Sequence, residues 1–256
     1  MLRTRVIPAL LLHGKSLVKT ERFEKYRYVG DPANTVRIFN ELEVDELCFL
    51  DISAARTRRT PDLNVLKEVA TECFMPLSYG GGIDSLDTAK KVFDIGYEKL
   101  VINTAAAEFP DLIGEIAAVY GAQAVVAGID VRRDWLGRRR LMARGDRKKL
   151  SSTPVSWARE LESRGAGEIL LTSIDREGTY KGFDEALIKE VAAAVDIPVI
   201  AHGGAGRTGD IKKAVLCGAS AVALGSLVVY QRQGMGVLVN FPSSEIEEIL
   251  KSIDGQ

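Results

Sequence analysis

An aspartate at the end of an apolar run is the first candidate for chemistry in this sequence. Asp130 closes a run in which every second residue, Val126 and Gly128, shares its face of a strand. A carboxyl group at the C-terminal end of a buried strand can act as a general acid or base. The matching position of the first strand holds Leu11, so a pair of carboxylates for acid–base work is half absent. The alternative is that Asp130 only caps the loop that follows it.

Two glycine-rich turns are candidates for binding phosphate. Glycine lets the backbone approach an anion closely, and a helix that begins after the turn offers free N–H groups. Together with the residues that end the next strand, the turns predict two sites: Gly81, Gly82, Asn103 and Thr104 in the first half, and Gly203, Gly204, Gly225 and Ser226 in the second. The doubled pattern indicates a ligand with two anionic ends. Glycines that merely form tight turns are the alternative.

These residues depend on eight short apolar runs that alternate with amphipathic segments. The predicted strands are residues 5–11, 46–52, 76–78, 99–103, 124–130, 168–173, 198–201 and 221–224. The predicted helices include residues 62–73, 85–95, 111–120, 155–164 and 184–195. Eight strand–helix units form a closed parallel sheet of about 250 residues. The chain has 256 residues and no linker-like stretch. We therefore predict the α/β class and one domain, residues 1–256, folded as a single (β/α)8 TIM barrel.

An internal repeat supports two half-barrels. A shift of 122 residues places Pro76 on Pro198 and the pair Gly81-Gly82 on Gly203-Gly204. The same shift places Asn103-Thr104 on Gly225-Ser226. The period is much longer than the repeats of solenoid proteins. A barrel built from two four-stranded halves accounts for it.

The chain resembles the cyclase subunit family of imidazole glycerol phosphate synthase over almost its whole length. The resemblance rests on segments at residues 30–32, 45–52, 80–83, 102–106, 128–130, 164–179 and 203–206. It implies a barrel in which ammonia from a glutaminase subunit reacts with a bisphosphate substrate, assisted by two aspartates. Asp130 matches one of these and Leu11 replaces the other. Lys19, on the long loop after the first strand, matches a family lysine that helps to close over the substrate.

Two stretches resemble a divergent branch of that family. They are residues 7–12 near the start and residues 237–242 near the end. The branch is associated with amidation of sugars in surface polysaccharide pathways. This resemblance implies that the barrel works with a glutaminase and a separate ATP-dependent sugar amidotransferase.

Four charged residues begin predicted strands on the inward side: Arg5, Glu46, Lys99 and Glu168. An unpaired charge at the floor of a barrel is costly, so two acids and two bases should pair into a ring. In the family this ring resembles the gate between glutaminase and barrel. The side chains above it suit neutral ammonia, being mostly apolar: Cys48, Leu50, Val101, Val126, Gly128, Leu170 and Thr172. A structural ion cluster that seals the floor is the alternative.

The loop after the fifth strand, residues 132–149, is strongly basic. It contains nine arginines and lysines against two aspartates, in a chain whose net charge is −1. One hypothesis is that it docks an acidic partner or a nucleotide-linked sugar where ammonia emerges. A solvated basic face is the alternative.

Composition restricts the remaining classes of function. A net charge of −1 gives no general attraction to nucleic acid, and no apolar run is long enough to span a membrane. Three scattered cysteines fit a reducing cytoplasm. The two histidines, His13 and His202, are too few and too far apart in the sequence to indicate a metal site. We expect a cytoplasmic protein without metal or cofactor.

These observations favour one function over two alternatives. The preferred function is a barrel subunit of a glutamine amidotransferase complex that conducts ammonia from a glutaminase at its N-terminal face. The acceptor would be a phosphorylated or nucleotide-linked sugar, and Leu11 makes the chain's own cyclase activity doubtful because leucine cannot transfer a proton. One alternative is a working cyclase of histidine biosynthesis. The other is a non-catalytic scaffold that binds phosphosugars.

Overall fold

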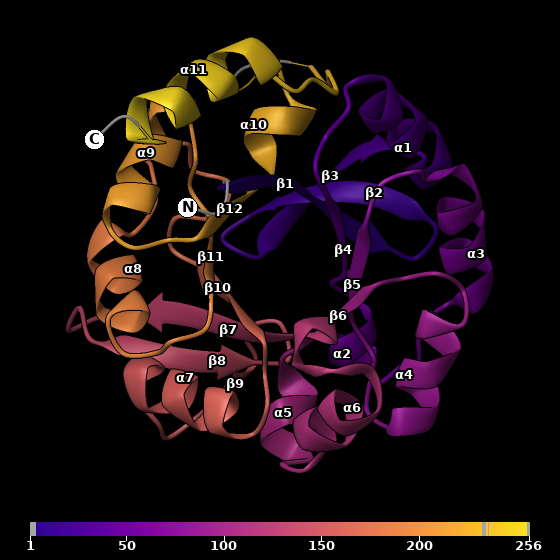
Figure 1. The fold of residues 1–256 in the computed structure, drawn as a ribbon, viewed down its shortest axis with the longest axis vertical. Coiled ribbons are helices and arrows are strands. Elements are labelled where there is room, and N and C mark those ends of the chain that lie inside the picture. The colour runs from indigo at the N-terminus through magenta and orange to yellow at the C-terminus, as the bar shows by residue number, and fades with distance from the viewer. Residues whose placement is uncertain (1–3, 232–233, 235, 255–256) are drawn as a thin grey trace.

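Eight parallel strands close into a barrel in the computed structural model, which describes residues 4–231, 234 and 236–254. The strands are β1 (Arg5–His13), β4 (Leu47–Asp51), β5 (Leu77–Gly80), β6 (Lys99–Ile102), β7 (Val125–Arg133), β10 (Glu168–Ser173), β11 (Val199–His202) and β12 (Ala221–Leu224). They pair in this order, and β12 pairs with β1 to complete the circle. Figure 1 shows the strands at the centre and the helices around them. The predicted (β/α)8 barrel is confirmed.

Helices on the outside connect successive strands. The longer ones are α1 (Pro32–Glu41), α3 (Leu63–Glu72), α4 (Leu86–Phe93), α6 (Leu112–Tyr120), α7 (Pro154–Ser163), α8 (Glu185–Ala192), α9 (Gly209–Leu216) and α11 (Ser243–Asp254). Shorter helical turns are α2 (Ala54–Thr57), α5 (Thr104–Glu108), η1 (Ala122–Ala124) and α10 (Ser226–Val229). Several begin where a side chain caps the first turn; Thr153 and Ser156 form a reciprocal capping box before α7. Every predicted strand and helix is found, with ends within three residues of the prediction.

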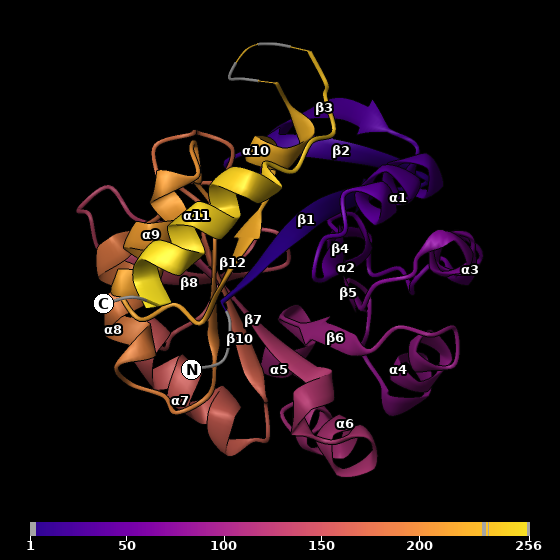
Figure 2. The same cartoon turned by 45° about the horizontal axis from the view of Figure 1, so that its top comes forward.

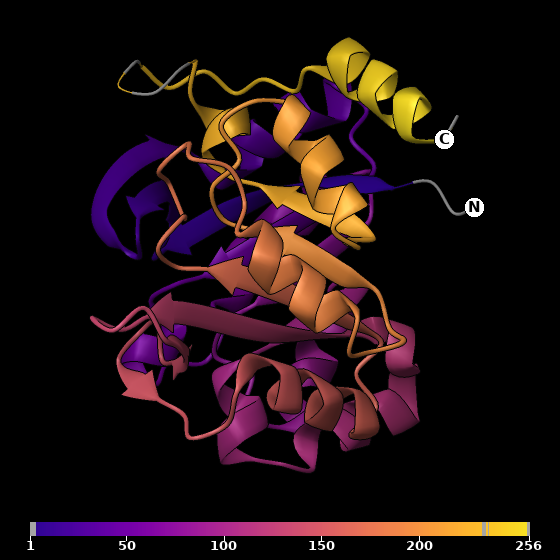
Figure 3. The ribbon, with the colours of Figure 1, turned by 90° about the vertical axis from the view of Figure 1, so that its left-hand side faces the viewer.

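Two segments that the sequence suggested were loops are β-hairpins. β2 (Ser16–Glu21) pairs back onto β1 and is followed by β3 (Glu24–Gly30). β8 (Arg139–Ala143) pairs back onto β7, and the two-residue β9 (Lys148–Lys149) follows it. Both hairpins extend barrel strands beyond the C-terminal end of the barrel, as Figures 2 and 3 show. The two hairpins therefore flank the site, and their hydrogen-bonded backbone is more rigid than the backbone of an open loop.

The core has two layers. The outer layer lies between strands and helices. The inner layer fills the barrel with Ile7, Ala9, Cys48, Leu50, Val101, Val126, Leu170, Ile200, Ala221 and Ala223. The predicted inward residues Cys48, Leu50, Val101, Val126 and Leu170 all belong to it. Among the described residues, no helix combines the length and apolar character that crossing a membrane requires.

The pairing register relates the two halves of the barrel. Leu11 is paired with Leu50 between β1 and β4, and Asp130 is paired with Thr172 between β7 and β10. Because the 122-residue shift places Leu50 on Thr172, Leu11 and Asp130 are equivalent positions. The first strands of the two halves are thus related by a shift of 119 residues. The structure places Leu11 where a symmetric barrel would carry a second aspartate.

Candidate functional site

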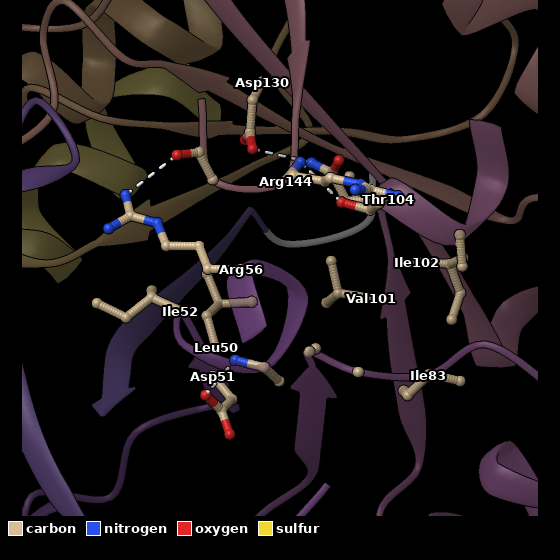
Figure 4. A pocket seen from close by; sticks show the side chains of 18 of the residues that line it. Leu50, Asp51, Ile52, Arg56, Ile83, Val101, Ile102, Thr104, Asp130 and Arg144 are labelled. Atoms are coloured by element: carbon tan, nitrogen blue, oxygen red, sulfur yellow. Dashed lines mark hydrogen bonds between the residues drawn. The ribbon is translucent and has the colours of Figure 1, made fainter. Parts of the chain in front are cut away.

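A cavity of about 400 Å³ opens at the C-terminal end of the barrel. This is within the usual size range of small-molecule sites, and it lies at the end of the barrel where enzymes of this fold carry their active sites. Leu11, Asp130 and His202 line it together with the first glycine turn. Figure 4 shows Asp130 on the opposite side of the cavity from Leu50 and Asp51.

Asp130 is held by side chains from the neighbouring strand ends. Asn103 Nδ2 donates a hydrogen bond of 2.9 Å to Asp130 Oδ2. Burial raises the pKa of Asp130 to about 7, although hydrogen bonds from Thr172 and Asn103 oppose that shift. A carboxyl group with a pKa near neutrality can give or take a proton at physiological pH. The geometry is therefore suited to the predicted acid–base role, which remains a prediction.

The wall near Leu11 is apolar. Leu11 is only 5% exposed and lines the cavity with Leu50, Val101 and Leu170. None of these side chains can transfer a proton. At the pair of equivalent positions 11 and 130, the barrel therefore has one carboxyl group, Asp130; Asp51, which ends β4, also lines the cavity and is paired with Arg59.

Lys19 is a residue of β2 in the first hairpin, and its side chain contacts Glu177. Both are buried and form an ion pair, and Lys19 Nζ also donates to Thr20 O at 3.2 Å. Burial lowers the pKa of Lys19, to about 7, whereas the carboxylate of Glu177 favours the ammonium form. Glu177 also accepts hydrogen bonds from Thr20 Oγ1 and Phe23 N. Lys19 is absent from the described lining of the cavity, and its role in closing over a ligand stays a prediction.

The first predicted phosphate site faces the cavity. Gly81, Gly82, Asn103 and Thr104 all line it, next to several arginines: Arg56, Arg58, Arg59 and Arg144. Gly82 has a positive φ of 69°, and a Cβ there would overlap the carbonyl oxygen of Arg59. Packing alone therefore requires glycine at position 82. The alternative that this glycine only forms a tight turn accounts for it whether or not phosphate binds.

The second predicted phosphate site lies away from the cavity. Gly203, Gly204, Gly225 and Ser226 are absent from the described lining of the cavity. The side chain of Lys19 covers Gly225, where a Cβ would lie 2.9 Å from Lys19 Cε. The structure therefore does not present two equivalent anion sites to one cavity, and a ligand with two anionic ends would need the first hairpin to move.

The four predicted ring residues meet at the N-terminal floor of the barrel. Arg5 binds Glu46 at 2.6 Å and Glu168 at 2.9 Å. Lys99 binds the same two carboxylates at 3.1 and 3.2 Å. Acids and bases therefore alternate around the ring, as the cost of unpaired buried charge requires. Glu168 Oε2 is buried and accepts no hydrogen bond from the described residues, so the ring retains one acceptor.

A small void lies between this ring and the cavity. Its volume is about 10 Å³, close to the room that one water-sized molecule needs. Glu46 of the ring lines the void, and Val101 and Leu170 line both the void and the cavity. Burial raises the pKa of Cys48, another lining residue, to about 12, which keeps its thiol uncharged. The side chains between the ring and Asp130 are thus mostly apolar, with one small void among them.

Six of the nine cations in the basic segment 132–149 form ion pairs with acids of the described residues. Arg133 and Arg139 pair with Asp184, and Arg144 and Lys148 pair with Glu108. Two further pairs lie within the segment itself: Arg132–Asp146 and Arg140–Asp134. The outside acids Glu108, Asp184 and Glu190 offset three of the seven excess positive charges, and these ion pairs hold the second hairpin to the barrel. This favours the structural alternative over a docking surface for acidic partners.

Sequence reasoning missed several polar residues of the site, among them Asp51, which ends β4 and lines the cavity, and also His202 and Glu177. His202 was considered only as a metal ligand, yet it lines the cavity. Glu177 was not considered at all, yet it anchors the first hairpin. His202 ends a strand directly before a glycine turn, which is the signal that marked the other strand-end residues. Glu177 had no such signal because its partner Lys19 is distant in the sequence.

Comparison with known proteins gives a consistent result. Residues 5–233 match the family described as Histidine biosynthesis protein. A Pseudomonas aeruginosa protein named "Putative imidazole glycerol phosphate synthase subunit hisF2" is 48% identical over 94% of this chain and 97% of its own length.

More distant relatives carry related names. A Leptospira borgpetersenii protein named "Putative imidazole glycerol phosphate synthase subunit HisF" is 43% identical, over 98% of this chain and 99% of its own. The "Imidazole glycerol phosphate synthase subunit HisF" of Alkaliphilus metalliredigens is 39% identical over 91% and 92%. The likeness extends along nearly the whole barrel in each case.

Proposed function

The chain belongs to the histidine biosynthesis protein family as a HisF-like barrel, and from that premise we propose that it conducts ammonia for a glutamine amidotransferase complex. Ammonia enters from a glutaminase subunit at the N-terminal face and leaves at the C-terminal cavity. The acceptor is a phosphorylated or nucleotide-linked sugar, activated by a separate ATP-dependent amidotransferase in the cytoplasm. The sugar acceptor rests on the resemblance of residues 7–12 and 237–242 to the branch associated with glycosyl amidation.

The arrangement of ring, void and cavity carries this proposal, because the void shares Glu46 with the ring and Val101 and Leu170 with the cavity. The ring lies at the floor of the barrel, and the Glu168 oxygen that lacks a partner among the described residues offers an acceptor for an entering N–H group. The apolar path beyond it suits neutral ammonia, since an ammonium ion would lose its hydration without compensation. A scaffold that only binds phosphosugars has no use for such a path.

Leu11 supports delivery of ammonia in preference to ring closure. Cyclisation with two acid–base groups needs proton transfer on both sides of the substrate. The cavity wall at Leu11 is apolar and makes no such transfer. The charge ring and the apolar lining above it are present, whereas Leu11 removes one of the two acid–base positions.

The N-terminal face offers apolar side chains to a partner. Phe74 follows α3 and is 89% exposed, and Val119 and Leu216 at the ends of α6 and α9 are also well exposed. The outer helices run opposite to the strands, so these residues lie at the same end of the barrel as the charge ring. Exposed large apolar side chains around an opening are typical of a protein interface.

A charge placed on this face should disrupt the complex. We expect Phe74→Glu to weaken binding of the glutaminase subunit about tenfold or more and to reduce the stimulation of glutamine hydrolysis, because a buried interface disfavours an unpaired carboxylate. Trp135→Glu is the matched control: Trp135 is 90% exposed but lies on the hairpin at the opposite end. Purified chain and glutaminase from the same organism are assayed for hydrolysis and binding. Equal effects of the two variants, or no stimulation by the unaltered chain, would count against the proposal.

A working cyclase of histidine biosynthesis is the second candidate. The retained Asp130 and Lys19 and the names of the relatives favour it. Complementation of a cyclase-deficient histidine auxotroph separates the two functions. We expect the unaltered chain to fail and Leu11→Asp to give slow growth, because that change restores the second carboxyl group. Growth with the unaltered chain would establish the cyclase instead.

A further inference from the structure

His202 is a polar side chain of the cavity to which neither the ring nor the proposed path assigns a role. It is the last residue of β11, where it is paired with Thr172 of β10 and Ala223 of β12. It is more than nine-tenths buried and lines the cavity with Asp130 and Leu11. One ring nitrogen, Nδ1, lies 3.1 Å from Thr172 Oγ1. The other, Nε2, makes no hydrogen bond to a described residue.

The position breaks the twofold pattern of the barrel. The 122-residue shift relates His202 to Gly80, where a Cβ would lie 2.8 Å from Val101 Cβ. The first half of the barrel therefore has no room for a side chain there. Polar groups of the second half come from three neighbouring strands, as Asp130, Thr172 and His202. The cavity thus has one polar wall facing the apolar wall of Leu11 and Leu50.

Hydrogen bonding fixes which nitrogen of His202 carries the proton. Thr172 is paired with Asp130 between β10 and β7, its hydroxyl group helps to lower the pKa of that carboxyl group, and it lies 3.1 Å from His202 Nδ1, but it has one proton to donate. An ionised carboxylate is the stronger acceptor, so Thr172 donates to Asp130. Nδ1 must then be the donor to Thr172, which leaves Nε2 with a free lone pair.

We propose that His202 positions ammonia at the exit of the barrel, with Nε2 accepting an N–H group. This inference rests on the proposed function, because ammonia is the donor that the path delivers. Ammonia held in this way keeps its own lone pair free for attack on an acceptor. Thr172 and Asp130 act through His202 by fixing its tautomer, in the way that a carboxylate orients a histidine in many sites.

The surroundings of His202 keep its ring uncharged. Burial, and to a smaller degree the nearby charge of Lys19, lower the pKa of His202 to about 3. A neutral ring can accept a hydrogen bond from ammonia, whereas an imidazolium could only donate. It also cannot convert arriving ammonia to the ammonium ion, which would no longer be a nucleophile.

The test is the nitrogen NMR spectrum of the histidine rings. The chain has only two histidines, so ¹⁵N-histidine labelling gives two ring systems, and His13→Gln identifies the signals of His202. At pH 9, above the pKa of Asp130, we expect Nδ1 to carry the proton and Nε2 to be bare. Thr172→Val should abolish this preference, while Thr172→Ser, which keeps the hydroxyl group, should preserve it. Ammonium chloride at pH 9, where much of it is uncharged ammonia, should shift the Nε2 signal.

Controls separate this inference from the function on which it rests. Sodium chloride at the same ionic strength should leave the Nε2 signal unchanged. A proton on Nε2 in the unaltered chain, or equal spectra of Thr172→Val and Thr172→Ser, would overturn the proposal. The same holds if ammonium chloride has no more effect than sodium chloride. These spectra need neither glutaminase nor acceptor, so failure of glutaminase stimulation would refute the proposed function without changing them.

Discussion

Replacing Glu46 with leucine is expected to lower the free energy of unfolding by about 3 kcal/mol, because it leaves two cations at the barrel floor with one carboxylate. Glu46 contacts both Arg5 and Lys99, and its own side chain is only 5% exposed. Loss of one partner leaves the other buried charge without compensation, which costs more than the pair contributes when intact. Urea unfolding monitored by circular dichroism measures the change.

A double variant tests whether the four residues act as one ring. Glu46→Leu combined with Lys99→Met removes one charge of each sign and leaves the Arg5–Glu168 pair of 2.9 Å. We expect the double variant to be more stable than Glu46→Leu alone, since the remaining charges balance. Both variants should still lose coupling between glutamine hydrolysis and ammonia delivery, because the gate is open in each. A double variant no more stable than the single one would refute the balanced ring.

The chemistry of the strand ends was largely predictable because barrel strands obey simple rules. Alternation along each strand placed Arg5, Glu46, Lys99 and Glu168 on the inward side, and the cost of buried charge then required that they pair. The same alternation placed Asp130 at the mouth. These predictions depend only on strand direction and side-chain period, which a (β/α)8 pattern determines.

The residues beyond the strand ends were not predictable in the same way. The partner of Lys19 is Glu177, and the arginines of the second hairpin find Asp184 and Glu108. These contacts join segments that are distant in the sequence and meet only once the barrel has closed. A local count of charge in residues 132–149 therefore overstated what is available to a partner. The enclosure of the second phosphate turn under Lys19 has the same origin.

Asp130 is expected to reduce the stability of the folded chain above neutral pH. Its pKa is about 7 in the fold and about 3.9 in an unfolded chain. Between these values the folded state binds more protons than the unfolded one, so stability falls as pH rises from about 4 to about 7. One pKa unit corresponds to about 1.4 kcal/mol, so the ionised carboxylate costs the fold up to about 4 kcal/mol above pH 7.

Asp130→Asn should therefore stabilise the chain by about 2–4 kcal/mol at pH 8 and by little at pH 4, while preserving the contact with Asn103. Urea unfolding of both chains at the two pH values measures this difference, and Asp45→Asn, at an exposed site before β4, is the control for loss of a carboxylate elsewhere. Equal stability of Asp130→Asn and the unaltered chain at pH 8 would show that the buried carboxylate carries no such cost. A group that weakens the fold in this way fits a chemical role better than a structural one. Leu11, the equivalent of Asp130 in the other half, carries no charge to desolvate. The first half of the barrel therefore does not lose the stability that a buried, ionised carboxylate would cost it.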